Sequence, residues 1–206
     1  MIATRSATLV EALATRSDAA SSRGTRAVAV LFFAAFTAAA AQVSVPLPFT
    51  QVPFTFQPMV VLLGGLALGP RLGAASQMVY LLAGIAGLPV FAMSPALPPG
   101  AWRLLGPTGG YLMSYPLAAF VAGALARRGF DRRYLTSVAA MAAGLLVIYA
   151  CGTLWLAYAA AGRAPIGLAS AFAAGVAPFV VADVVKLAAA ASIVPGLWRL
   201  IAPSSR

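Results

Sequence analysis

Asp183 and Lys186 carry the strongest chemical signal in this sequence. They lie three residues apart in the apolar segment PFVVADVVKLAAAASIVPGLW, so a helix places both side chains on one face. A charged side chain inside a bilayer costs at least about 2.5 kcal/mol, and such residues usually face a cavity or a charged partner. We therefore predict that the pair binds a polar ligand. An ion pair that only fixes helix packing is the alternative.

Two loops are expected near this pair. Residues 44–57 contain the uncharged stretch PLPFTQVPFTFQP, whose prolines and phenylalanines are unusual in a solvent-facing connector. Residues 90–109 contain Arg103 and lead into the next apolar run through Gly-Pro-Thr-Gly-Gly, residues 106–110. Exposed amides at such a helix start, that of Gly109 among them, favour an anion, although a plain turn fits the same residues. Arg103 itself has two open roles, a ligand contact or a lipid-headgroup anchor.

The residue types in these segments suit a small organic anion. Arg103, Lys186 and the glycine amides could meet a carboxylate, and Asp183 could accept hydrogen bonds from N–H donors. Binding sites usually also have apolar walls. The candidates for these walls are Phe49, Phe54, Phe56, Trp102 and Tyr111. Two further polar side chains, Gln57 and Tyr149, are expected to reach either the ligand or a neighbouring helix.

The composition excludes several classes of protein. The chain has no His, one Cys and one Lys, so it cannot build a metal cluster, a disulfide framework or a Cys/His dyad. Lys186 does not stand in a Gly-Lys-Ser/Thr motif, so the chain has no phosphate loop of that type. We therefore expect no catalytic residue, no metal and no cofactor. A membrane-embedded enzyme that uses Asp183, Lys186 and Tyr111 for acid/base chemistry is an alternative, but it lacks an activated nucleophile.

Six apolar windows are long enough to cross the roughly 30 Å of membrane hydrocarbon. They are residues 27–43, 53–70, 71–89, 110–127, 134–160 and 178–199. The chain is 62% hydrophobic, far above an ordinary soluble domain. The sequence therefore predicts an all-α, polytopic integral membrane protein with six transmembrane helices. The segment GLASAFAAGVA before the last window is expected to be a short helix or a linker.

The basic residues indicate the orientation of the six windows. One side receives Arg5, Arg16, Arg23, Arg26, Arg71, Arg127, Arg128, Arg132, Arg133, Arg199 and Arg206. The other side receives only Arg103 and Arg163. Because Lys and Arg accumulate on the cytoplasmic side, both termini are predicted to be cytoplasmic, and loops 44–57 and 90–109 lie outside. A surface for nucleic acid is not expected, because the arginines lie at the ends of apolar runs.

The chain is expected to divide into an N-terminal tail, residues 1–26, and a membrane domain, residues 27–206. The tail is rich in Ser, Ala and Arg, as an organellar transit peptide is, but Glu11 and Asp18 weaken that pattern. We therefore expect a disordered or surface-lying cytoplasmic tail without chemistry.

Small residues repeat with helical spacing in the first window, which contains FFAAFTAAAAQ. Ala34 with Ala38, and Ala35 with Ala39, form small-xxx-small pairs that let another helix approach closely. These alanines are therefore candidates for docking a partner. Alanine is abundant throughout the chain, so packing within the protein is the alternative.

Four motifs together resemble the BioY family, the biotin-specific S components of energy-coupling factor (ECF) transporters. They are VPLPFTQVPFTFQP, GLPVFA, GPTGGYL and DVVK, in this order, and the resemblance covers residues 27 to about 200. It implies a six-helix ECF S-component fold that captures biotin from outside, with the loop between the first two helices closing over the ligand. Asp183 and Lys186 match the Asp-x-x-Lys of the family's binding site. Residues 106–111 match an element close to that site, and Arg103 is the candidate for an arginine that the third loop contributes in relatives.

The resemblance also implies partners and a location. Relatives work in the plasma membrane with a coupling (T) subunit and two ATPase (A) subunits, and the alanine motif is the family's docking surface. This chain would then borrow ATP hydrolysis from such partners. Asp183 would accept hydrogen bonds from the ureido group of biotin, and Lys186 or Arg103 would meet an acceptor oxygen. Biotin is the transported ligand in this interpretation, and no cofactor is needed.

An ion-coupled secondary transporter of a small organic anion is the alternative function. Asp183 would then carry a proton, as intramembrane carboxylates do in such proteins. The sequence shows no inverted repeat, and a lysine so close to the carboxylate does not suit a proton carrier.

Overall fold

The computed structural model describes residues 8–14, 19–93, 100–161 and 164–201. The helices are α1 (Leu9–Ala14), α2 (Ala19–Gln42), α3 (Gln57–Leu68), α4 (Pro70–Ile85), α5 (Trp102–Leu105), α6 (Gly109–Leu125), the π-helical turn η1 (Ala126–Phe130), α7 (Tyr134–Tyr158), α8 (Gly167–Gly175), α9 (Val180–Ala190) and α10 (Ile193–Ile201). The strands are β1 (Ser44–Val45) and β2 (Phe54–Thr55). Four arginines used above for the orientation, Arg5, Arg16, Arg163 and Arg206, lie outside the described residues.

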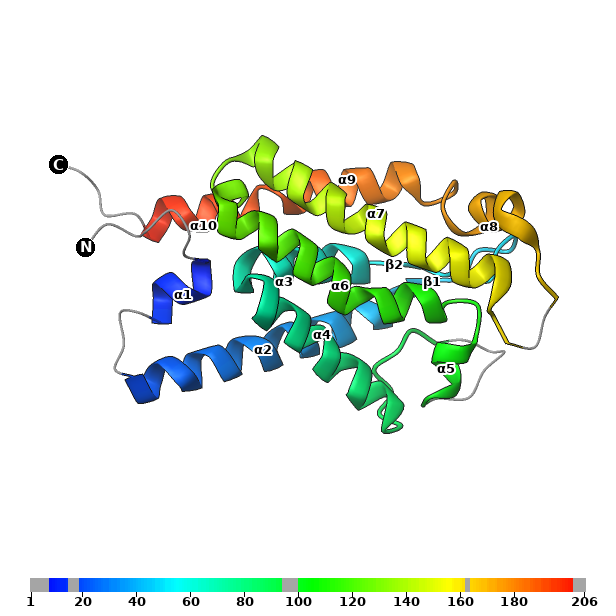
Figure 1. The fold of residues 1–206 in the computed structure, drawn as a ribbon, viewed down its shortest axis with the longest axis horizontal. Helices are drawn as coiled ribbons and strands as arrows, with labels where there is room; N and C mark the ends of the chain where they lie inside the picture. Colours follow the sequence, from blue (N-terminus) through cyan, green and yellow to red (C-terminus); the bar gives the residue numbers. More distant parts are fainter. Residues whose placement is uncertain (1–7, 15–18, 94–99, 162–163, 202–206) are drawn as a thin grey trace.

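The long helices run along the longest axis of the molecule (Figure 1). α2, α6, α7 and the α9–α10 pair extend between the two ends, and α3 and α4 lie among them. α1 and α10 lie at one end, whereas the hairpin of β1 and β2, α5 and α8 lie at the other. The two strands pair antiparallel, with Ser44 opposite Thr55 and Val45 opposite Phe54. The fold therefore brings both of the loops singled out above to the same end.

Each predicted window corresponds to a helix or to a pair of helices. Four segments of the described chain are long and apolar enough to cross a membrane. They are Ser22–Gln42, Gly109–Phe130, Tyr134–Tyr158 and Val180–Leu200. The segment GLASAFAAGVA, predicted to be a short helix or a linker, forms α8. The prediction of a helical membrane protein is thus confirmed. The count of six membrane crossings stays a prediction.

The second and third windows give shorter helices than expected, because a Gly-Pro corner separates them. α3 has 12 residues and α4 has 16. Pro58 stands in the first turn of α3, where its missing N–H costs nothing. Gly69 ends α3 with a φ of 81°, which L-residues with a side chain rarely adopt, and Pro70 then begins α4. Both helices therefore meet at a sharp corner near the end occupied by α1.

The last predicted window, residues 178–199, is divided into α9 and α10. The turn between them lies at Ala191 and Ser192. Pro195 accounts for the break, because proline has no N–H to donate and its ring clashes with the carbonyl four residues earlier, that of Ala191. The Ser192 hydroxyl donates to the Ala189 carbonyl at 2.8 Å and so satisfies an acceptor near the end of α9. The two short helices together still have the length of one membrane span.

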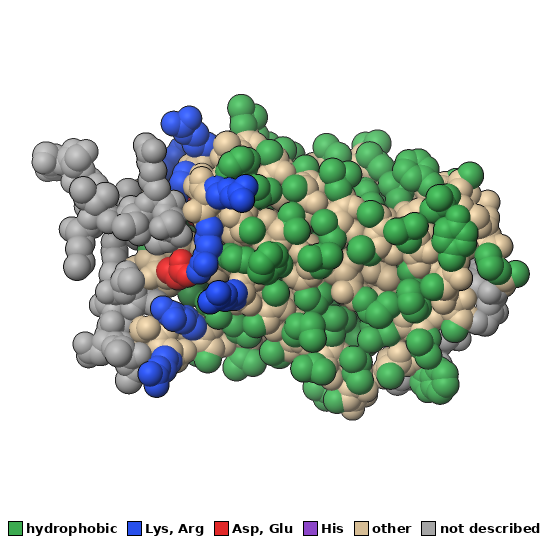
Figure 2. All heavy atoms as spheres, viewed as in Figure 1, with side chains coloured by type: hydrophobic (Ala, Val, Ile, Leu, Met, Phe, Trp, Pro, Cys, Tyr) green, Lys and Arg blue, Asp and Glu red, His purple; other side chains and the backbone are tan. Residues whose placement is uncertain are grey.

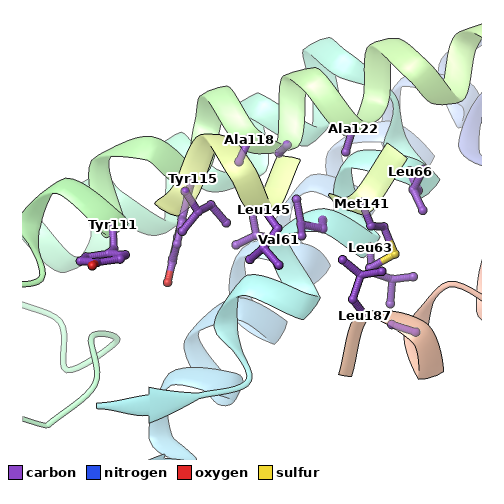
Figure 3. Packing of buried hydrophobic residues seen from close by; sticks show 14 of the residues in the cluster. Val61, Leu63, Leu66, Tyr111, Tyr115, Ala118, Ala122, Met141, Leu145 and Leu187 are labelled. Carbon is purple, nitrogen blue, oxygen red and sulfur yellow. The ribbon is translucent and has the colours of Figure 1, made fainter. Parts of the chain in front are cut away.

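α3 is the centre of the bundle and is buried on all sides. Every residue from 60 to 68 is buried, and side chains of α3, α6, α7 and α9 meet in this core (Figure 3). A Cβ atom added at Gly65 would lie only 2.5 Å from the carbonyl oxygen of Ala119 in α6. The small residue therefore lets the backbones of α3 and α6 touch, as is common in membrane helix pairs.

Basic side chains gather at the end that holds α1, α10 and the start of α2 (Figure 2). Hydrophobic side chains cover most of the remaining face that Figure 2 shows. The segment RRGFDRR, residues 127–133 between α6 and α7, supplies several of the arginines. Arg103 belongs instead to α5 at the opposite end. Among the described residues, the fold thus places Arg103 at the end away from the other arginines, in agreement with the grouping used to predict the orientation.

Residues 8–14 form a packed helix, which differs from the disordered or surface-lying tail expected from composition. The Thr8 N–H donates to the Glu11 carboxylate at 3.0 Å, and the Thr8 hydroxyl accepts from the Glu11 N–H at 3.4 Å. This reciprocal arrangement is a capping box and starts α1. Apolar residues of α1 are buried against α2 and α3. Arg127 of η1 donates to Glu11 at 2.6 Å and ties α1 to the bundle.

We expect the Glu11–Arg127 pair to stabilise the protein at neutral pH and to lose that effect in acid. Burial raises the pKa of the Glu11 carboxyl, but hydrogen bonds from Thr8 and Arg127 outweigh it, so the pKa lies below its ordinary value. A carboxyl with a lowered folded-state pKa contributes stability above its unfolded pKa and loses that contribution as the pH falls through the folded pKa. Glu11→Gln should therefore cost about 0.5 kcal/mol at pH 7, the scale of a partly exposed ion pair, and almost nothing at about pH 3.

Thermal unfolding in detergent at both pH values measures this difference. Arg128→Gln is the control for a change of one unit in net charge, because it neutralises an exposed side chain beside Arg127, of opposite sign to Glu11. If Glu11→Gln lowers the stability equally at the two pH values, the stability does not depend on the ionisation of Glu11, and the prediction is wrong.

Candidate ligand-binding site

A cavity of about 300 Å³ lies at the end of the molecule that holds the hairpin. Its walls come from the hairpin loop, the start of α3, the segments around 91–93 and 103–108, and α6, α7 and α9. Proline, aromatic and aliphatic residues make up most of the lining. A volume near the lower limit of small-molecule sites, with a few convergent polar groups, is typical of a pocket for a small ligand.

Asp183 and Lys186 form a buried ion pair on the cavity wall. One Asp183 carboxylate oxygen contacts the Lys186 ammonium, and the other accepts a hydrogen bond from the Tyr149 hydroxyl at 2.6 Å. The two charged residues are only 7% and 8% exposed. The structure confirms that they share one helix face and reach one cavity; their contact with a ligand stays a prediction.

Lys186 also connects α9 to the hairpin. Its ammonium donates to the Thr55 carbonyl at 2.7 Å and lies 4.0 Å from the centre of the Phe54 ring, close enough for a cation–π interaction. Thr55 and Phe54 form β2, and residues between the strands line the cavity. Some of the prolines and apolar residues that looked unusual in a solvent-facing loop, among them Pro46, Val52 and Pro53, therefore form part of the cavity wall.

Among the described residues, the charged side chains that line the cavity have a net charge of +1. Lys186 and Arg103 are cationic, and Asp183 is anionic. Burial lowers the pKa of the Arg103 guanidinium, and an arginine side chain nevertheless keeps its proton near neutral pH. One excess positive charge suits a ligand with a single negative charge.

Gln57 and Tyr111 also line the cavity, and their polar groups are bonded within the protein. Gln57 Nε2 donates to the Tyr80 hydroxyl at 2.6 Å, and the Tyr111 hydroxyl donates to the Gly175 carbonyl at 2.9 Å. The first bond joins α3 to α4, and the second joins α6 to the end of α8. Both predicted residues therefore hold the cavity wall together as well as facing the cavity.

Gly109 is not among the residues that line the cavity. Its N–H donates to the Gly106 carbonyl at 3.0 Å. A Cβ atom at Gly109 would lie 1.8 Å from the carbonyl oxygen of Leu104, so no side chain fits there. Close backbone packing therefore accounts for this glycine, and its use as an anion-binding amide stays a prediction.

The predicted aromatic wall is only partly formed. Tyr111 lines the cavity, and Phe54 lies against the Lys186 ammonium rather than on the wall itself. Phe49 and Trp102 are 66% and 62% exposed, and neither lines this cavity. The loops place some of the expected rings around the site and leave others on the surface.

Tyr115 and Thr55 belong to the site although neither was predicted from the sequence. Tyr115 lies four residues after Tyr111, so the two share a face of α6, and helical spacing could have identified it. Thr55 contributes its backbone carbonyl to Lys186, which no residue type reveals.

The four candidate docking alanines lie on two sides of α2. Ala34 is buried and Ala38 is half-buried, and both pack against the core. Ala35 and Ala39 are exposed. Only the Ala35–Ala39 pair is therefore accessible to another helix.

Apolar helices of membrane-spanning length, with a charged internal cavity at one end, define a helical membrane protein of the ligand-binding class. The chain belongs to the BioY family, whose model matches residues 13–203. It is 44% identical over 164 residues to the probable biotin transporter BioY of Pyrococcus horikoshii, covering 80% of this chain and 90% of that one. It is 38% identical over 168 residues to the biotin transporter BioY of Thermotoga maritima, covering 82% and 92%.

The fold is similar to that in the crystal structure of the S-component for biotin from an ECF-type ABC transporter. The TM-score is 0.78 over 89% of this chain and 95% of that chain, at 23% sequence identity. This similarity confirms the S-component fold.

Proposed function

We propose that this protein binds biotin and acts in its uptake across the cell membrane, as the S component of an ECF-type transporter. The observation that carries the proposal is the single cavity that Asp183, Lys186 and Arg103 all line. Membership of the BioY family, with relatives named biotin transporters, supports biotin as the ligand.

Biotin matches the chemistry of the cavity at both of its polar ends. The ureido ring has N–H donors for the Asp183 carboxylate and a carbonyl oxygen for a cation. The single carboxylate of the valeryl chain offsets the excess positive charge and can meet Lys186 or Arg103 in a charge-assisted hydrogen bond. The thioether ring and the valeryl chain are apolar, which suits the proline and aromatic lining.

The proposed topology has six membrane crossings, with α3 and α4 as the second and third. The end with α1, α10 and most arginines would lie in the cytoplasm, and the hairpin and the cavity would face outward. Biotin would then be captured from outside the plasma membrane.

Energy would come from partner subunits, a membrane-embedded T subunit and two ATPase A subunits. The chain has no phosphate loop of its own. The exposed Ala35–Ala39 pair on α2 is the proposed contact for the T subunit, because small residues permit close helix approach.

Equilibrium binding of labelled biotin to the purified chain tests the proposal, with three competitors that each remove one feature. Desthiobiotin keeps the ureido ring and the carboxylate and should compete well. Biotin methyl ester lacks the negative charge and should compete poorly, and lipoic acid lacks the ureido ring and should not compete. Failure of the folded chain to bind biotin would overturn the proposal. Biotin accumulation driven by a proton gradient in vesicles without any ATPase would instead favour an ion-coupled transporter.

A further inference from the structure

Trp155 of α7 lies behind the cavity wall and does not line the cavity itself. Its indole Nε1 donates to the Gly106 carbonyl at 2.8 Å. Gly106 begins the turn that leads into α6, and the next two residues, Pro107 and Thr108, are part of the cavity wall. One hydrogen bond from α7 therefore reaches the backbone of the wall directly next to the residues that face the ligand space.

Two glycines at the start of α6, directly after this turn, make room for the Trp155 side chain. A Cβ atom at Gly109 would lie 3.0 Å from Trp155 Nε1 and would also meet the backbone of α5. A Cβ atom at Gly110 would lie 2.2 Å from Trp155 Cβ and 2.7 Å from the Cys151 carbonyl oxygen. Any larger residue would push the turn away from α7. The Gly-Gly pair is thus explained by the backbone of α5 and α7 together with the Trp155 side chain packed against it.

The preceding segment is anchored to the same end of α7. The Ala161 N–H donates to the Leu105 carbonyl at 2.8 Å, so α5 is bound just beyond the point where Trp155 holds Gly106. α5 carries Arg103, which lies on the cavity wall. The end of α7 therefore fixes the whole segment from Arg103 to Thr108.

We infer that Trp155 is a positioning residue for ligand binding: its indole N–H and ring hold the 103–110 segment against the cavity, so that Arg103 and Thr108 keep their places on the wall. The inference deepens the proposed function and rests on it for the identity of the ligand. Trp155 acts through the turn and does not touch the ligand.

Trp155→Phe tests the inference, because it keeps an aromatic ring and removes the N–H donor. The dissociation constant for biotin should rise about fivefold, the scale of one lost hydrogen bond of ordinary strength. Hydrogen–deuterium exchange should speed up in residues 103–110 and stay unchanged in α9. Trp102→Phe is the matched control, because it makes the same change at an exposed position directly before this segment, on a side chain that does not line the cavity.

A tryptophan analogue with sulfur in place of the indole N–H, inserted at position 155, supplies a second variant if Trp155→Phe fails to fold. It preserves the shape of the ring and removes only the donor. Unchanged exchange in residues 103–110, or an affinity within about twofold of the parent, would overturn the inference. Exchange that speeds up equally in α9 would also overturn it, because the residue would then serve the general stability of the bundle. If the parent itself does not bind biotin, the proposed function fails, and the exchange comparison alone decides the role of Trp155.

Discussion

The double variant Asp183→Asn/Lys186→Met is expected to fold almost as stably as the parent and to bind biotin at least about thirtyfold more weakly. Each residue is more than nine-tenths buried, and each is paired with the other. Removing both charges leaves no uncompensated ion in the protein, and neutral replacement of a buried pair is often close to neutral for stability. The ligand, however, loses both charged partners, and stranding a buried polar group costs about 2 kcal/mol or more.

The single variants separate binding from folding. Asp183→Asn leaves the Lys186 ammonium with the Thr55 carbonyl and the Phe54 ring as its remaining contacts, so we expect a loss of about 3–5 kcal/mol in stability. Lys186→Met should cost less, because the Tyr149 hydroxyl still donates to the Asp183 carboxylate. Thermal unfolding and biotin titration of the parent, the two single variants and the double variant give a complete double-mutant cycle for both stability and affinity. Parent-like binding by the double variant would remove the pair from the ligand site and leave it only a role in helix packing.

Gly65→Ala should destabilise the bundle strongly although it adds a single methyl group. The new Cβ atom would lie 2.5 Å from the Ala119 carbonyl oxygen and 3.1 Å from its Cα, and backbone atoms of a packed helix cannot move aside as a side chain can. Overpacking of a core costs about 1–3 kcal/mol, and we expect the upper part of that range here. Biotin binding should weaken as well, because α3 and α6 both carry residues of the cavity wall.

Gly196→Ala is the matched control for this prediction. Gly196 lies in α10 with no atom within 4 Å of the position of an added Cβ. Alanine favours a helix over glycine by about 0.8–1 kcal/mol, so this variant should unfold at the same temperature as the parent or higher. A similar unfolding temperature for Gly65→Ala and Gly196→Ala would show that α3 and α6 do not meet as closely as described.

Local signals in the sequence predicted those features that depend on neighbouring residues. Asp183 and Lys186 share a helix face because of their spacing, and long apolar runs gave the membrane helices. The break before α10 could also have been predicted, because Pro195 clashes with the residue four positions earlier. The capping box that begins at Thr8 has the pattern Thr-x-x-Glu, but the surrounding Ser, Ala and Arg residues obscured it.

Features that depend on distant residues could not be predicted in the same way. Gly109 looked like a ligand-binding glycine, and only the fold shows that Leu104 and Trp155 occupy the space around it. The same holds for α2, where alanine spacing marked two equivalent pairs and only the packing shows which one is exposed. Arg103 was a candidate from the sequence with two open roles, and only the fold shows that the short helix α5 places it on the cavity lining. The spacing of residues therefore identified the Asp183–Lys186 pair, whereas the arrangement of the segments around the pair is known only from the fold.

The excess positive charge of the cavity wall has an electrical consequence. A singly charged anion in the cavity brings the sum for Asp183, Lys186, Arg103 and the ligand to zero. An electric field does no work on a neutral group, whereas moving one elementary charge through 100 mV involves about 2.3 kcal/mol. If the proposed uptake moves the loaded site inward, that step would therefore be nearly independent of the resting voltage, and only the return of the empty, positively charged site would be sensitive to it.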